Sequence, residues 1–193
     1  MELFWEACSG LKGTPENLEG MLEKFPQMSK RGAIQYLLAG GWAVELLTGS
    51  KREHEDIDVF CVDEDYLSTL NTSIGPGFVN DERAAIFYAH CFGNFSTRLI
   101  KKHYTQEVEI GNRKVVIPST EFLLLFKLFL PLREKDAHDV AAIFNTQQIN
   151  PGKLANILRT IGYTNPQQRA HEIVNLNYYK VDQLKDYQGI RPS

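Results

Sequence analysis

The sequence predicts an α+β fold with a mixed sheet in its first half and helices toward its C-terminus. Up to Pro118, short apolar segments of strand length are separated by glycine-containing turns, and after it apolar residues recur at helical spacing. With 193 residues, of which 43% are hydrophobic, the chain is long and apolar enough to bury a sizeable core. We expect a sheet that carries the functional residues and helices that close one side of it.

The predicted elements of the first half follow from their boundary residues. Thr14 and Pro15 are typical of a helix N-terminus, because a hydroxyl caps free N–H groups and proline fits the first turn. Gly40 and Gly41 separate a strand from a helix, and two Gly-Asn pairs predict hairpins. The predicted elements are a helix over 15–25, strands over 34–39 and 56–62, a helix over 42–47, a short helix near 66–70, and hairpin strands over 84–92, 95–100, 107–110 and 113–117.

The second half is predicted to be helical. Ser119 is a typical N-cap residue, and the apolar residues after it recur every three or four positions. The predicted helices span 119–129, 135–144, 154–161 and 167–178. No repeat or long linker marks a boundary, and we assign a core domain to residues 12–145 and a helical extension packed on it to residues 146–193.

Composition and charge exclude several classes of protein. The formal net charge of -3 disfavours a general nucleic-acid binder and a protein drawn to anionic membranes. The three cysteines are odd in number and far apart, so neither a disulfide framework nor a zinc cage is predicted. The N-terminus lacks the pattern of a signal peptide, and the longest apolar stretch, residues 122–132, is roughly half as long as a membrane span. We expect a cytoplasmic protein.

The stretch from Gly40 to Asp58 carries the pattern that points to chemistry. Gly40 and Gly41 allow the backbone to approach a ligand closely, and a helix that begins at Trp42 directs free N–H groups toward an anion such as phosphate. Asp56 and Asp58 are two residues apart on a predicted strand, so their side chains share one face. Two carboxylates on one face can bind Mg²⁺, which completes its coordination with phosphate oxygens.

Each half of this pattern also has a simpler interpretation. The Gly40-Gly41 pair taken alone is compatible with a plain turn. A second Asp-x-Asp pair, Asp63 and Asp65, is interpreted as a solvated strand end or helix start. The Asp56/Asp58 pair differs from this second pair in its context. It follows a glycine turn, a helix and a basic loop, an order that brings a phosphate cradle and metal ligands together.

In these residues the sequence resembles the nucleotidyltransferase superfamily related to DNA polymerase β, and within it the lincosamide and aminoglycoside nucleotidyltransferases. The first matching segment, residues 40–59, reads GGWAVELLTGSKREHEDIDV, with the family's glycine-glycine-tryptophan helix start, basic loop and H-x-D-I-D pattern. The second, residues 113–140, reads RKVVIPSTEFLLLFKLFLPLREKDAHDV and is similar to the family's later strand, lysine-bearing helix and R-x-K-D-x-x-D segment. The nucleotidyltransferase toxins of some toxin-antitoxin pairs are similar in the same two segments.

The resemblance implies a polymerase-β-like nucleotidyltransferase fold and assigns roles to individual residues. Asp56 and Asp58 would be the catalytic residues that hold Mg²⁺. Gly40, Gly41 and Trp42 would contact the nucleoside triphosphate. These five residues, together with Lys127 as a further nucleotide-binding residue, form the predicted site.

The resemblance also points to charged residues, Lys127 among them. Lys127 would support the nucleotide or an acidic cluster, although a lysine on an apolar helix also extends its charged end to the surface. Glu45 and His54 are candidates for positioning substrate, or are solvated helix and loop residues. A further group is compatible with a site and with a surface ion-pair network: Arg133, Lys135, Asp136 and Asp139.

One departure from the family concerns its third carboxylate. The family commonly places this group on a later strand, where residues 95–100 of this sequence contain no acid. Glu107 and Glu109, on one face of the next hairpin, are the nearest substitutes or else a solvated face. The five histidines lack the spacing of a zinc enzyme, and no pattern suggests covalent catalysis.

These observations predict a Mg²⁺-dependent nucleotidyltransferase. It would move a nucleoside monophosphate from a nucleoside triphosphate, with ATP as the expected donor, to a hydroxyl group of a small molecule such as an antibiotic. The substrate hydroxyl would attack the α-phosphorus, and pyrophosphate would leave. The alternatives are a catalytically degenerate module that binds nucleotide or a partner protein, and a nucleotidyltransferase of the toxin-antitoxin type.

Overall fold

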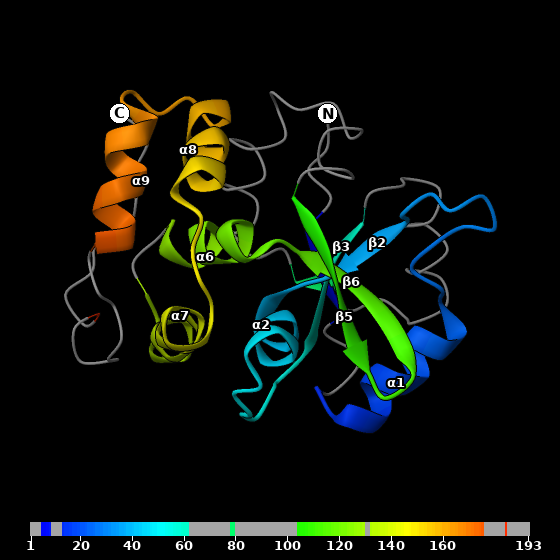
Figure 1. Ribbon diagram of the computed structural model, residues 1–193. Helices are drawn as coiled ribbons and strands as arrows, with labels where there is room; N and C mark the ends of the chain where they lie inside the picture. Colours follow the sequence, from blue (N-terminus) through cyan, green and yellow to red (C-terminus); the bar gives the residue numbers. More distant parts are fainter. Residues whose placement is uncertain are drawn as a thin grey trace. The chain divides into compact units, whose positions relative to one another are not determined.

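The computed structural model describes residues 5–8, 13–61, 78–79, 104–129, 132–175 and 184 (Figure 1). The chain divides into two compact units: unit 1 comprises residues 1–85 and 105–118, and unit 2 comprises residues 86–104 and 119–193. This division differs from the boundary expected after residue 145, because helices from both sides of that position pack together in unit 2. The assignment of a core domain to residues 12–145 and of an extension to residues 146–193 stays a prediction. The elements predicted near 66–70, over 84–92 and over 95–100, and the Asp63/Asp65 pair, lie outside the described residues.

Unit 1 contains two antiparallel sheets. The larger sheet has the strand order β2-β3-β1-β4 and consists of β1 (Trp5–Cys8), β2 (Tyr36–Leu38), β3 (Ile57–Cys61) and β4 (Phe78–Val79). The smaller sheet is the hairpin of β5 (Thr105–Ile110) and β6 (Arg113–Pro118) around the predicted Gly-Asn turn. The α+β class is confirmed, and every strand pair among the described residues is antiparallel.

Helix α1 (Pro15–Lys24) begins at the predicted cap. The Thr14 hydroxyl accepts a hydrogen bond from the Asn17 N–H at 3.3 Å, which satisfies one of the free donors of the first turn. One face of the helix is buried through Leu18, Met21 and Leu22. The apolar residues whose spacing predicted α1 are therefore the residues that this helix contributes to the core.

Gln27 ties the segment after α1 to the hairpin. Its buried side-chain amide donates a hydrogen bond to the Val116 carbonyl at 2.7 Å and accepts one from the Val116 N–H at 2.7 Å. A neighbouring strand would make the same two bonds, so the amide covers this part of the β6 edge. In β2, the Tyr36 hydroxyl donates to the Phe25 carbonyl at 2.6 Å. These contacts fix the path between α1 and β2.

Helix α2 (Gly40–Thr48) begins two residues earlier than the predicted start at Trp42. Gly40 and Gly41 form its first turn instead of a separate turn before it. Gly40 has a φ angle of +58°, a left-handed value that glycine adopts without the strain of a side chain. The turn and the helix start therefore overlap at this residue.

Unit 2 contains four helices within the described residues: α6 (Thr120–Leu128), α7 (Glu134–Thr146), α8 (Pro151–Thr160) and α9 (Pro166–Asn175). The Ser119 hydroxyl caps α6 by accepting a hydrogen bond from the Phe122 N–H at 3.3 Å. The buried Glu121 carboxylate accepts one from the Asn150 N–H at 3.0 Å, which ties α6 to the start of α8. The predicted helical half is confirmed over these ranges. Among the described helices, none has the length and apolar character needed to span a membrane.

Candidate functional site

The start of α2 meets β3 inside unit 1. The Ala39 N–H donates a hydrogen bond to the Asp58 carbonyl at 2.9 Å. A Cβ atom built on Gly40 would lie 2.5 Å from the Cγ atom of Asp58, closer than real side chains approach. Glycine is therefore needed here for its backbone angle and for the room that it leaves to the Asp58 carboxylate. The structure brings together one glycine and one acid of the predicted site.

Asp56 and Asp58 alternate with buried residues at the start of β3. Ile57 and Val59 are 0% and 1% exposed, whereas both aspartates are half-buried. The strand begins at Ile57, so Asp56 lies one residue before it and not within it as predicted. The alternation matches a two-residue period in which the aspartates share the face away from the core.

His54 is held between two residues of α2. Its Nε2 atom lies 2.8 Å from Oε2 of Glu45, and its ring stacks on Trp42 with 4.2 Å between ring centroids. The His54 side chain is only 3% exposed. The solvated interpretation of Glu45 and His54 is therefore wrong for the histidine, because the loop after α2 returns to the helix and buries the imidazole.

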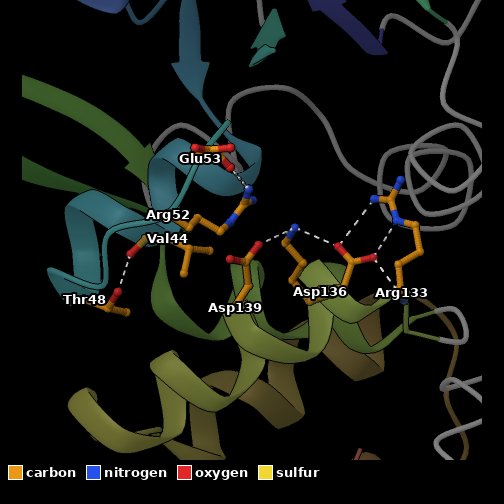
Figure 2. A network of polar contacts seen from close by, with 8 residues as sticks. Val44, Thr48, Arg52, Glu53, Arg133, Asp136 and Asp139 are labelled. Carbon is orange, nitrogen blue, oxygen red and sulfur yellow. Dashed lines mark hydrogen bonds and ion pairs between the residues drawn. The ribbon is translucent and has the colours of Figure 1, made fainter. Parts of the chain in front are cut away.

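Arg52 lies against the second glycine of α2. A Cβ atom built on Gly41 would lie 2.7 Å from Cζ of Arg52 and 2.8 Å from Nδ1 of His54. The Arg52 backbone N–H donates to Glu45 at 3.3 Å, and its Nη1 donates to the Glu53 carbonyl at 2.9 Å (Figure 2). From the sequence, this segment is predicted only to be a basic loop. The signal for this residue was the second glycine, whose missing side chain makes room for the guanidinium.

Trp42 presents a buried donor beside these residues. The residue is 5% exposed, and its indole Nε1 has no hydrogen-bond partner within the part of the chain that the structure describes. A buried donor without a partner destabilises a protein by about 1–3 kcal/mol. An oxygen atom of a ligand would supply the missing acceptor.

Lys127 belongs to unit 2 and lies in a buried ion cluster. Its ammonium group is 3.0 Å from Asp136 and 2.9 Å from Asp139, and Arg133 binds Asp136 at 2.8 Å (Figure 2). The Lys127, Asp136 and Asp139 side chains are 6%, 2% and 4% exposed. The lysine therefore does not extend to the surface, and the aspartates are not part of a surface network. Lys127 contacts two acids of this cluster, and its role in a site and toward a nucleotide stays a prediction.

The cluster is electrostatically balanced and shifts the pKa values of its members. Burial lowers the pKa of Lys127, but the two aspartates outweigh this effect, so the pKa rises above its ordinary value. Burial raises the pKa of Asp136, but Lys127 and Arg133 outweigh it and hold the pKa well below its ordinary value of 3.8. Both shifts favour the charged forms.

The two residues considered in place of the family's third carboxylate lie on the β5–β6 hairpin. Glu107 and Glu109 are exposed on β5, and Glu107 forms an ion pair with Lys114 at 3.0 Å. Within the described ranges, no three histidine, cysteine, aspartate or glutamate side chains gather as a metal-binding group. Residues 95–100, the strand without an acid, lie outside those ranges.

Comparison with known proteins gives a family match over part of the chain. The model of the aminoglycoside-2''-adenylyltransferase family matches residues 21–74, which are 54 of the 193 residues. The matched stretch includes α2, the loop that carries Arg52 and His54, and β3. No match was found among curated proteins or among solved structures. The family match supports a nucleotidyltransferase-like resemblance and, in general terms, nucleotidyltransferase activity.

Proposed function

We propose that this chain is a Mg²⁺-dependent nucleotidyltransferase that transfers a nucleoside monophosphate from a nucleoside triphosphate to a hydroxyl group of a small molecule. ATP is the expected donor, and an aminoglycoside or lincosamide antibiotic is the first acceptor to test. The observation that carries the proposal is the contact of the Asp58 carboxylate with Gly40 at the start of α2. The family match over residues 21–74 supports the same chemistry.

The donor set of the site suits Mg²⁺. Asp56 and Asp58 are half-buried acids, and the Asp58 carboxylate lies at the N-terminus of α2. Mg²⁺ is commonly held by one or two carboxylates together with phosphate oxygens. Both aspartates would hold the ion, and no other acid is required for binding. When bound, Mg²⁺ would neutralise charge on the triphosphate and on the departing pyrophosphate.

The remaining groups of the site would bind and orient the triphosphate. The N–H groups of the first turn of α2 and the positive end of its dipole favour an anion at Gly40 and Gly41. The acceptor hydroxyl oxygen would form a bond to the α-phosphorus while the bond to pyrophosphate breaks, and the hydroxyl proton would pass to water. Positioning and charge stabilisation contribute most of the catalysis in phosphoryl transfer, so a protein base is not essential.

A second candidate function is a degenerate module that binds nucleotide without turnover. It is favoured by the absence of a three-acid group within the described ranges. The two functions share the binding site and differ only in whether pyrophosphate is released.

Calorimetry and a pyrophosphate assay distinguish these possibilities. The protein is titrated with several nucleoside triphosphates with and without Mg²⁺, and is then incubated with Mg²⁺, labelled ATP and panels of aminoglycosides, lincosamides and nucleosides. We expect Mg²⁺-dependent binding and acceptor-dependent release of pyrophosphate. Binding without release for every acceptor would favour the degenerate module, and no binding of any triphosphate would refute both.

A further inference from the structure

The loop that follows α2 turns back onto the first turn of the same helix. His54 occupies the centre of this arrangement, because its ring contacts Trp42 by stacking and Glu45 through Nε2. Glu45 also accepts a hydrogen bond from the Arg52 backbone N–H at 3.3 Å. One carboxylate thus fixes the backbone of Arg52 and the imidazole of His54 at the same time.

Gly41 shows where this arrangement directs the arginine. A side chain at that position would collide with the guanidinium of Arg52 and with the ring of His54. The guanidinium therefore lies directly over the first turn of α2, where the helix carries its free N–H groups. Lys51, the neighbouring cation in the sequence, is exposed.

We propose that Glu45 and His54 are positioning residues that hold Arg52 over the N-terminus of α2, where its guanidinium binds the oxygens of the triphosphate. This inference rests on the proposed function and specifies which cation of the chain meets the triphosphate. A guanidinium suits this task because its planar set of donors matches two phosphate oxygens at once. Trp42 supports the arrangement by stacking on the His54 ring.

Holding the Arg52 side chain in place before the triphosphate binds should increase the affinity for the triphosphate. A long cationic side chain loses rotamer freedom when it binds, and a side chain that is already held loses less. We expect this prior ordering to contribute about a two- to tenfold gain in affinity. The contact between the guanidinium and phosphate itself contributes about ten- to a hundredfold, since it is a charge-assisted hydrogen bond.

The first test compares two variants that remove the same charge. Wild type, Arg52→Gln and Lys51→Gln are titrated by calorimetry with tripolyphosphate without metal and with Mg-ATP. We expect Arg52→Gln to raise the Kd of both ligands about ten- to a hundredfold and Lys51→Gln to change it less than about threefold. Equal affinity of Arg52→Gln and wild type would overturn the inference while leaving the proposed function in place.

The second test separates positioning from a general structural effect. Glu45→Ala should raise the Kd about two- to tenfold, whereas Glu45→Gln should largely restore affinity because its amide can still bond to His54. In the Arg52→Gln background, Glu45→Ala should have no further effect. The exposed acid Glu53 provides the control Glu53→Gln. A loss of equal size with and without Arg52 would overturn the positioning role.

The two ligands distinguish failure of the inference from failure of the proposed function. A wild-type protein that binds tripolyphosphate through Arg52 but does not bind Mg-ATP would refute the nucleotide function and support the anion site. A wild-type protein that binds neither would overturn both. Thermal unfolding of each variant, measured beside the titrations, identifies any loss of affinity that comes from a loss of fold.

Discussion

Replacement of Lys127 by methionine tests the buried ion cluster of unit 2. Methionine is close to lysine in length but carries no charge, so it removes the contacts at 3.0 Å to Asp136 and 2.9 Å to Asp139. Both aspartates are almost fully buried, and removing one partner of a buried ion pair costs about 3–5 kcal/mol. Arg133 keeps its contact with Asp136, whereas Asp139 loses its contact with Lys127.

Urea unfolding followed by circular dichroism measures this effect. We expect Lys127→Met to lower the free energy of unfolding by about 3–5 kcal/mol. The matched control is Lys153→Met, which removes an exposed lysine from α8 of the same unit and should change stability by less than about 0.5 kcal/mol. Adding Asp139→Asn to Lys127→Met should restore part of the loss, because it removes the buried charge that Lys127 contacted. Equal stability of Lys127→Met and its control would refute the reasoning.

The same variant should change how stability depends on pH. The pKa of Asp136 is lowered in the folded protein, so its contribution is present above the ordinary value of 3.8 and is lost as the pH falls below it. The pKa of Lys127 is raised, so its contribution is present below 10.5 and is lost as the pH rises through the higher folded value. Lys127→Met should therefore lose less stability in acid than wild type does. An equal loss would contradict the coupling.

Three further predictions concern unit 1. Asp56→Asn and Asp58→Asn should weaken Mg²⁺-dependent triphosphate binding in calorimetry without lowering the unfolding temperature, and Glu53→Gln is the control; unchanged affinity of both variants would refute the metal assignment. Gly40→Ala should destabilise the protein by at least about 1–2 kcal/mol in urea unfolding, because of the left-handed backbone and the contact with Asp58. Gly20→Ala, in an open position of α1, should instead stabilise it by about 0.5–1 kcal/mol, and equal effects of the two would contradict this account. Gln27→Leu should cost about 1–3 kcal/mol, because it leaves the Val116 N–H and carbonyl without this partner; a neutral effect on urea unfolding would show that the amide does not secure the β6 edge.

Local patterns predicted the parts of the molecule that depend on neighbouring residues. The Thr14 cap, the Gly-Asn hairpin and the alternation around Ile57 each follow from a few adjacent positions, and each is present in the structure. Strands β1 and β4 have four and two residues, too few for a recognisable alternation, and they form through pairing with distant segments. Their existence could not be inferred from their own residues.

The surroundings of charged residues also depend on distant segments, so they could not be predicted from neighbouring residues. The sequence shows that Lys127 lies on an apolar helix, but only the packing of α6 with α7 decides whether its charge is exposed or paired. Likewise, the His54 contact with Glu45 joins residues nine positions apart and requires the loop to turn back. Because a charged side chain is energetically acceptable in water or with a partner, composition alone does not distinguish these outcomes.

The two glycines at the start of α2 connect the sequence pattern with the proposed site. From the sequence, the space beside these glycines is predicted to receive a ligand. In the structure, side chains of the chain itself lie there: the Asp58 carboxylate at Gly40 and the Arg52 guanidinium at Gly41. A negative and a positive side chain therefore lie beside two adjacent residues of the α2 backbone. A carboxylate attracts a cation and a guanidinium attracts phosphate oxygens, so the ligand that satisfies both is one that carries a metal ion and a phosphate chain together. For this reason we expect Mg-ATP to bind more tightly than either Mg²⁺ or metal-free ATP.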